Sequence, residues 1–323
     1  MQMNDRVVGV IGAMCLALCA GLAGAEPNLQ RDGEAKEIFR LKCAKQSADA
    51  WTEVLPSMAS DVRRQITPDG EATTYRYDDT NSPVVEVTSL FRRGADDERR
   101  YRLRVRTREG WHLARADHPR LIAPLQRDGN ADDERLMIST CKGGVWRNPS
   151  ASPLGTTTFV GSPGRCAGQF GAVWNSDAGL YFGVEDAKGY LKYFGFERCE
   201  DCIEFRSEEN MWLTGTFEQD YDIVRREVHR RSPDQPLTWC DFADLSRRWN
   251  ARQDWCRTRY LDRADIPSWM KDAPAFTRFS RQWLERPERI AAFVEWWKRE
   301  FGEMPVVTAF WGWEKVGTWW GPD

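Results

Sequence analysis

Residues Phe159–Glu197 decide the fold class of this chain; they read FVGSPGRCAGQFGAVWNSDAGLYFGVEDAKGYLKYFGFE. Apolar and polar residues alternate in three stretches of it, Gln169–Trp174, Leu180–Val184 and Tyr190–Phe196. Clusters of Asn, Asp and Gly separate the three stretches, and glycine adopts the positive φ angles that tight turns require. Period-2 alternation between such clusters predicts a three-stranded β-meander.

Similar alternating segments fill most of the chain before and after this one. Val84–Phe91 and Arg100–Arg106 alternate around a short charged link, which predicts a hairpin with one face in water. A large number of short strands favours two packed antiparallel sheets, because a single open sheet would leave one face unburied. We therefore predict a mainly β protein with a β-sandwich over residues 51–236. Residues 26–50 show only an irregular pattern and are predicted as an N-terminal extension.

The sequence changes character after Pro236, where the apolar period shifts from 2 to 3.6. Asp241 can cap one helix, and Pro287–Glu300 is a clear amphipathic helix that begins with proline and is followed by Gly302. Residues 237–304 are therefore predicted as a helical connector. The unbroken apolar run at 305–310 predicts a strand buried on both faces. Since a complete (β/α)8 barrel takes about 250 residues, residues 305–323 are predicted as the first strand and loop of an incomplete barrel of that type.

The N-terminal residues predict the compartment. Residues 1–25 have a polar start, an apolar stretch from Val7 to Ala23, and a small-residue cleavage site, Ala23-Gly24-Ala25. They read as a secretory signal peptide, so we expect an exported protein, periplasmic or extracellular. No other apolar run is long enough to cross a bilayer, so no membrane association is expected after cleavage. The formal net charge of −3, with both signs well mixed, argues against nucleic acid as a partner.

Cysteine usage leaves the redox state open. Seven cysteines follow the predicted cleavage site, and Cys199-Glu-Asp-Cys202 has the spacing of a metal or redox motif. No second cysteine pair or nearby histidine completes a zinc site, so no metal and no cofactor are predicted. A turn closed by a disulfide, or a simply reduced turn, is the favoured interpretation of this motif.

The central segment also resembles a known family. Its matching residues are Pro163-Gly164, Gln169-Phe170, Gly179-Leu180-Tyr181, Asp186, Gly189 and Lys192. Together they resemble the "P-G…Q-F…G-L-Y…D…G…K" signature of an uncharacterised, domain-of-unknown-function family of secreted glycoside-hydrolase-like proteins. The resemblance runs from about Trp51 to the last residue and is most specific here and near Trp255 and Trp311. It implies a supersandwich-like β-sandwich followed by a (β/α)8 barrel, and carbohydrate as the partner.

Candidate site residues follow from this resemblance and from the chemistry of sugars. Glycoside hydrolysis needs two facing carboxyl groups, and Glu314 alone stands where a barrel strand ends, so no catalytic residue is assigned. Sugar rings stack on indole faces, so Trp311 and Trp313 beside Glu314 are predicted to contact substrate, with core packing as the alternative for Trp313. Asp186 could reach the same site from the sandwich, although a turn-forming role is favoured.

Three functional interpretations remain. The leading one is the N-terminal sandwich part of a carbohydrate-active, glycoside-hydrolase-like secreted protein that is not catalytically competent in this form. The second is a stand-alone carbohydrate-binding β-sandwich module, and the third is a non-functional gene fragment. An apolar strand at 306–310 without a partner would have an exposed edge, so we also expect self-association through the C-terminal segment.

Overall fold

The structure is a computed structural model that describes residues 34–45, 51–68, 70–95, 98–124, 133–140, 143–149, 157–162, 166–199, 202–272, 275–279, 283 and 286–310. The chain divides into two compact units, residues 1–249 and 250–323, and each is described by itself. The predicted signal peptide and the predicted site residues Trp311, Trp313 and Glu314 lie outside the described residues.

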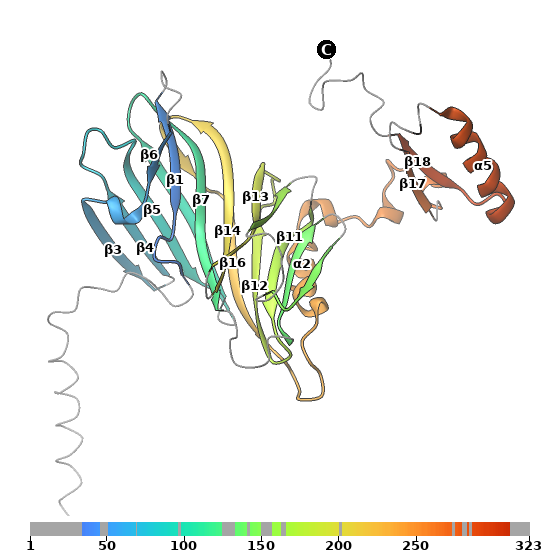
Figure 1. Cartoon of the computed structure of the whole chain (residues 1–323), viewed down its shortest axis with the longest axis horizontal. Helices are drawn as coiled ribbons and strands as arrows, with labels where there is room; N and C mark the ends of the chain where they lie inside the picture. Colours follow the sequence, from blue (N-terminus) through green and yellow to red (C-terminus); the bar gives the residue numbers. More distant parts are fainter. Residues whose placement is uncertain are drawn as a thin grey trace, which may run out of the picture. The chain divides into compact units, whose positions relative to one another are not determined.

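The first unit is a β-sandwich of two antiparallel sheets (Figure 1), as the strand count predicted. In the described part of the chain, one sheet has six strands in the order β10-β13-β14-β7-β1-β2. These strands are β1 (Arg40–Lys45), β2 (Trp51–Val54), β7 (Trp111–Pro124), β10 (Thr157–Ser162), β13 (Lys192–Arg198) and β14 (Cys202–Leu213). A single 3-10 turn, η1 (Pro56–Met58), follows β2.

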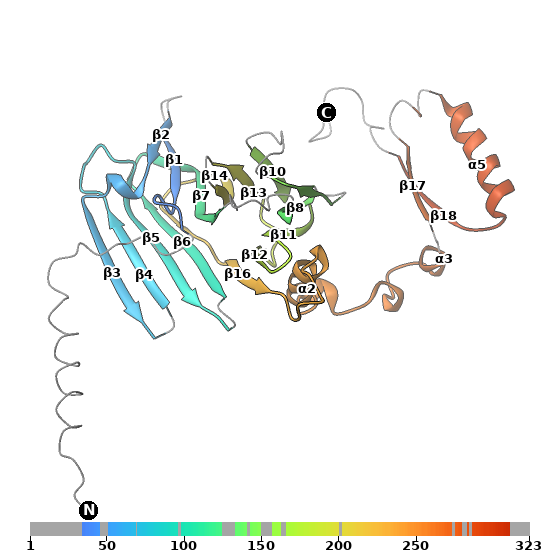
Figure 2. The same cartoon turned by 60° about the horizontal axis from the view of Figure 1, so that its bottom comes forward.

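The second sheet has ten strands among the described residues, in the order β3-β4-β5-β6-β16-β12-β11-β8-β9, with β15 paired to β6. Figure 2 shows β3 to β6 side by side as a meander. The strands of this sheet are β3 (Asp61–Thr67), β4 (Gly70–Arg76), β5 (Val84–Arg93), β6 (Arg99–Thr107), β8 (Arg135–Thr140), β9 (Val145–Arg147), β11 (Cys166–Trp174), β12 (Ala178–Glu185), β15 (Thr216–Glu218) and β16 (Asp222–His229).

Alternating apolar side chains of both sheets form the core. Phe182 of the ten-stranded sheet stacks on Phe205 of the six-stranded sheet with ring centroids 4.8 Å apart. Phe194 and Tyr101 are also fully buried in this layer. Each such ring contributes about 1.5–3 kcal/mol by leaving water, so the contact between the sheets is the main source of stability.

The predicted meander is correct for two strands and wrong for the third. β11 and β12 form the expected hairpin. β13, however, pairs with β10 and β14 in the other sheet. Alternation identifies a segment as a strand with one buried face, but both inner faces of a sandwich are apolar. The pattern therefore cannot tell which sheet a strand joins.

The N-terminal region is also more ordered than predicted. The part of residues 26–50 that the structure describes includes β1, which lies between β2 and β7. Phe39, Leu41 and Cys43 are completely buried in the core. The prediction of an extension is wrong for residues 34–45. The apolar alternation of β1 is short. A bulge between Lys42 and Cys43 in the pairing with β7 interrupts it, so the strand is hard to recognise in the sequence.

The predicted helix after Pro236 exists as α2 (Trp239–Asn250), and it packs on the sandwich. Phe242 is fully buried, and its ring centroid lies 5.1 Å from that of Trp174 in β11. Gly179 of β12 permits this approach, since a Cβ there would be 2.7 Å from the Phe242 ring. α2 thus covers the outer face of the ten-stranded sheet beside β12 and β16 (Figure 2) and belongs to the first unit.

The second unit contains a β-α-β element. Its parts are η3 (Asp254–Cys256), η4 (Tyr260–Asp262), α3 (Ser268–Lys271), β17 (Ala275–Phe279), α5 (Pro287–Phe301) and β18 (Val306–Phe310). β17 and β18 pair in parallel on either side of α5 in the sequence. The prediction that Val306–Phe310 is the first strand of its sheet is therefore wrong, because β17 precedes it within the predicted connector. Thr277 and Arg278 break the apolar run of β17 and conceal it in the sequence.

The predicted long helix is confirmed in α5, which begins at Pro287 and is followed by Gly302 at φ 63°. Glycine suits a positive φ at the end of a helix. Within the described residues, no helix combines the length and the apolar character needed to cross a membrane.

Candidate functional site

Two of the segments in which the chain passes from one sheet to the other line one pocket. The first crossover is the loop 186–191, which leads from β12 to β13, and the second is the segment 213–221, which leads from β14 through β15 to β16. An open pocket of about 510 Å³ lies between them, with Tyr190, Glu209, Trp212, Asp220 and Tyr221 in its lining. We call it the crossover pocket.

Asp186 organises the first crossover. Its Oδ1 accepts hydrogen bonds from the backbone N–H groups of Lys188, at 2.8 Å, and Gly189, at 3.0 Å. Its Oδ2 accepts from the N–H of Tyr190 at 2.6 Å. Such bonds from a short carboxylate to the next residues create a tight turn. Gly189 has φ 69°, which a residue with a side chain adopts only with strain.

Lys192 closes the same turn from β13. Its Nζ pairs with Asp186 and donates to the Tyr190 carbonyl at 2.7 Å and to Gln169 Oε1 at 3.4 Å. It also lies 4.9 Å from the centroid of the Tyr221 ring. The side chains of the ion pair are 0% and 1% exposed. A buried charge needs such complete pairing, and here it is provided by the protein itself.

The structure gives the family-like motif a physical meaning. It brings together Gln169, Asp186, Gly189 and Lys192, since the Gln169 Nε2 group also donates to the Asp186 carbonyl at 2.9 Å. These residues fix the crossover loop and therefore one wall of the pocket. Asp186 faces its own loop and Lys192, so contact between Asp186 and a sugar stays a prediction.

Glu209 of β14 also lines the pocket and is paired in register with Lys192. Its Oε1 accepts a hydrogen bond of 2.5 Å from the Tyr221 hydroxyl. Burial raises the pKa of Glu209 to about 7, against the opposing effects of Tyr221 and Lys192, and the charges of Asp186 and Asp220 add to the rise. Glu209 is thus a carboxyl group that is protonated in part of the molecules near neutral pH.

Asp220 has the opposite protonation behaviour. Its Oδ2 accepts from Lys188 Nζ at 2.5 Å and from the Tyr190 hydroxyl at 3.3 Å. Burial acts to raise the pKa of Asp220, but these bonds outweigh it and lower the pKa. The pocket therefore presents one carboxyl group with a raised pKa, Glu209, and one with a lowered pKa, Asp220.

Exposed aromatic rings lie at and beside Trp212, which lines the pocket. Trp212 of β14 is 59% exposed and stacks on His112 with ring centroids 4.6 Å apart. Trp51 of β2, 57% exposed, meets Trp212 edge to face at 5.9 Å. Sequence analysis did not select Glu209, Trp212 or Trp51, because they lie far apart in the chain and no motif surrounds them. The one signal in the sequence for this site is Trp212, a tryptophan that follows a polar stretch of a strand.

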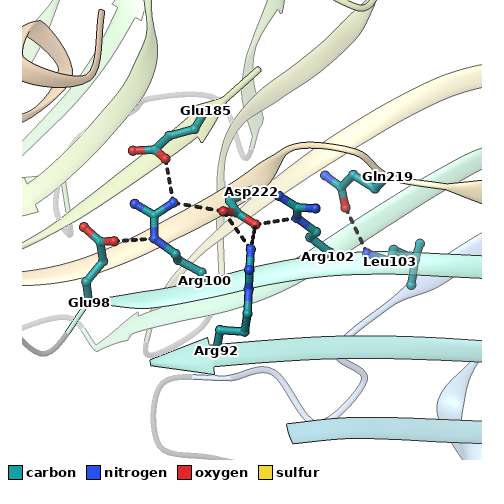
Figure 3. A network of polar contacts seen from close by, with 8 residues as sticks. All are labelled: Arg92, Glu98, Arg100, Arg102, Leu103, Glu185, Gln219 and Asp222. Atoms are coloured by element: carbon teal, nitrogen blue, oxygen red, sulfur yellow. Dashed lines mark hydrogen bonds and ion pairs between the residues drawn. The ribbon is translucent and has the colours of Figure 1, made fainter. Parts of the chain in front are cut away.

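A second polar cluster lies on the ten-stranded sheet and has a structural role (Figure 3). Asp222 of β16 accepts hydrogen bonds from Arg92, Arg100 and Arg102, at distances of 2.5 to 3.0 Å. Arg100 also contacts Glu98 and Glu185. Three cations and three carboxylates thus connect β5, β6, β12 and β16. Because their charges balance, the cluster serves to brace the sheet. Among the described residues, no three His, Cys, Asp or Glu side chains are placed to hold a metal.

Comparisons with known proteins show the fold. No protein-family profile matches the sequence, and no curated protein matches it. The structure is similar to that of the α-N-acetylgalactosaminidase NagBb from Bifidobacterium bifidum in complex with GalNAc. The TM-score is 0.56 at 13% identity, covering 90% of this chain and 50% of that chain. The Gal-NHAc-DNJ complex of NagBb gives a TM-score of 0.52 at 12% identity, covering 86% and 46%.

A weaker likeness is to the GH36 α-galactosidase AgaB from Geobacillus stearothermophilus, with a TM-score of 0.40 at 12% identity over 83% of this chain and 38% of that chain. A TM-score of 0.40 is too low to support a conclusion about the fold. The chain spans about half the length of NagBb. At such low identity the likeness concerns the fold, so the glycoside-hydrolase-like fold that the sequence resemblance implied is confirmed.

Proposed function

We propose that this chain is the sandwich-bearing part of an exported, carbohydrate-active protein related to glycoside hydrolases, and that its crossover pocket contacts sugar. The proposal is supported by the similarity to NagBb over 90% of the chain. Since fold alone does not determine function, the observation that carries the proposal is the composition of the pocket.

The pocket has the groups that sugar recognition uses. The exposed face of Trp212 and the Tyr190 ring offer surfaces on which the C–H face of a pyranose can stack. Glu209, Asn210 and Asp220 line the same pocket and can hydrogen-bond to hydroxyl groups. Concave sites with aromatic walls and a few placed polar groups are typical of small-ligand binding. The Lys192 ammonium is fully engaged within the protein, so the ligand expected here is neutral.

Binding can be measured with the sugars that the fold similarity suggests. N-acetylgalactosamine, galactose and their oligosaccharides are titrated into the purified chain and followed by calorimetry and ligand-observed NMR. We expect Trp212→Ala to weaken binding about tenfold, which corresponds to about 1.4 kcal/mol. Trp239→Ala is the matched control, because Trp239 is similarly exposed but lies at the start of α2. Equal losses in both variants, or no binding to any sugar, would reject the pocket as a sugar site.

A second candidate is hydrolysis in the pocket itself, favoured by the contrast between Glu209 and Asp220. Glycosidases use one protonated and one ionised carboxyl group, and these two groups differ in that way. We favour binding without turnover, since the sequence offers no motif for catalysis here. Aryl α-N-acetylgalactosaminides and α-galactosides provide the test. Release of the aryl group by the chain, and its loss in Glu209→Gln, would support hydrolysis over binding alone.

A further inference from the structure

Two cysteines face each other at the far end of the hairpin that carries the pocket. β13 and β14 form a regular antiparallel ladder from the pair Lys192 and Glu209, at the pocket, to the pair Arg198 and Ile203. Immediately beyond that second pair, the N–H of Cys199 donates to the carbonyl of Cys202 at 2.8 Å. The ladder therefore continues by one step, and the two cysteines are its last opposed residues.

Both cysteines of this pair are free thiols. Each is half-buried. Directly opposed residues of antiparallel strands have Cβ atoms about 4.5–5.5 Å apart. A disulfide requires about 3.5–4.5 Å. A decrease of about 1 Å in the distance between the two Cβ atoms is therefore enough for the bond.

We propose that Cys199 and Cys202 form a disulfide that closes the β13–β14 hairpin. The co-reactant is a small disulfide such as oxidised glutathione. One cysteine thiolate attacks it, forming a mixed disulfide and releasing one glutathione thiolate. The second cysteine thiolate then attacks the mixed disulfide and releases the second glutathione. The protein loses two electrons and two protons, and both appear in the two molecules of reduced glutathione.

The surroundings favour a structural bond rather than a catalytic dithiol. Burial, the neighbouring Cys199 thiol and the charge of Glu204 together raise the pKa of Cys202 to about 12. Strongly oxidising dithiols rely on a stabilised thiolate, which holds them in the reduced form. Cys202 lacks that stabilisation, so its disulfide is not easily reduced once formed. The export predicted from the sequence would bring the pair to a compartment where disulfides persist.

Mass spectrometry tests the bond directly. The folded chain is equilibrated with oxidised glutathione, its remaining thiols are alkylated, and it is digested with trypsin without reduction. Cleavage after Arg198 and Arg206 releases both cysteines in one peptide, residues 199–206. We expect this peptide unalkylated and lighter by two hydrogen atoms than the reduced form. We also expect the oxidised chain to melt at a higher temperature than the reduced chain.

Two variants separate this pair from the other thiols. Cys240→Ser/Cys256→Ser removes two exposed cysteines and should leave the cross-linked peptide and the rise in melting temperature unchanged. Cys199→Ser should abolish both, while circular dichroism reports a folded chain. Peptide 199–206 recovered with two alkyl groups, or with glutathione on either cysteine, from folded and fully equilibrated protein would overturn the proposal. This test does not depend on sugar binding.

Discussion

Lys192 is an unusual residue for the interior of a sandwich, because burying an ammonium group is costly unless all its hydrogens are paired. The Asp186 carboxylate, the Tyr190 carbonyl and the Gln169 side chain provide that pairing. Removing one partner of a buried ion pair leaves the other charge uncompensated. The pair therefore specifies the conformation of the crossover loop more than it adds to stability.

We predict that Lys192→Met lowers the free energy of unfolding by about 3 kcal/mol, as expected for a broken buried pair. Urea denaturation measures this change. Lys188→Met is the matched control, because Lys188 pairs with Asp220 at the surface, where water screens the pair and it adds little to stability. If the two variants lost equal stability, the buried pair would not be holding the loop.

Glu209 makes stability depend on pH. Its pKa of about 7 in the folded chain lies above its ordinary value of 4.5, so the folded state binds the proton more tightly than the unfolded state. Its contribution is complete below about pH 4.5 and is lost as pH rises through 7. We predict that Glu209→Gln, compared with the unmodified chain, gains about 2.5 kcal/mol between pH 5 and pH 8. Denaturation at both pH values measures the difference.

The exposed carboxylate of Glu218, which also lines the pocket, provides the control for this prediction. Glu218→Gln removes a carboxylate from the same pocket and so tests whether the effect belongs to Glu209. A Glu209→Gln variant with unchanged pH dependence would mean that the Glu209 carboxyl group is ionised in the folded protein at all these pH values.

At the scale of elements, the sequence predicted what depends on local pattern and missed what depends on partners. The hairpin of β11 and β12 follows from alternation around Asn175-Ser-Asp-Ala-Gly179, and α5 from its period and its ends. β13 joins the other sheet, and periodicity does not reveal which sheet a strand joins. The resemblance selected Asp186 and Lys192, but their mutual contact could be known only from the fold.

The residues of the crossover pocket also depend on partners that are distant in the sequence. Glu209 and Trp212 line it because β14 ends where the second crossover begins, and Trp51 approaches Trp212 from a strand on the other edge of the sheet. Such a site is assembled from distant segments. The sequence pointed instead to Trp311 and Trp313, two tryptophans that are neighbours along the chain.

α2 offers a test at this scale. We predict that Phe242→Ala lowers the free energy of unfolding by about 3–5 kcal/mol, as is usual when a buried phenyl ring is removed. Trp239→Ala in the same helix should change it by less than about 0.5 kcal/mol, because Trp239 is exposed. Denaturation and the rate of proteolysis within α2 measure both variants. Comparable effects would show that α2 does not depend on its contact with Trp174.

At the scale of the whole molecule, we expect the first unit to fold by itself only when it includes both β1 and α2. We predict that residues 34–250 unfold cooperatively, whereas residues 51–236 do not. The shorter piece lacks β1, so β7 loses a neighbouring strand, and it lacks α2, so Trp174 and Tyr181 lose their cover. Near-ultraviolet circular dichroism during thermal unfolding measures this. A sharp transition in the shorter piece would contradict the prediction.

The order of the strands in the two sheets also affects the order in which the strand pairs form during folding. β3, β4, β5 and β6 pair with their neighbours in sequence, so this meander closes only short loops and can form early. β1 must wait for β7, and β7 must wait for β14, because each pairing closes a long loop at a cost in chain entropy. During synthesis the ten-stranded sheet therefore begins first and displays its apolar inner face to the cell. The apolar inner face of the β3–β6 meander stays without its cover until β7 and β14 of the six-stranded sheet have been made, so the nascent chain exposes apolar surface during synthesis.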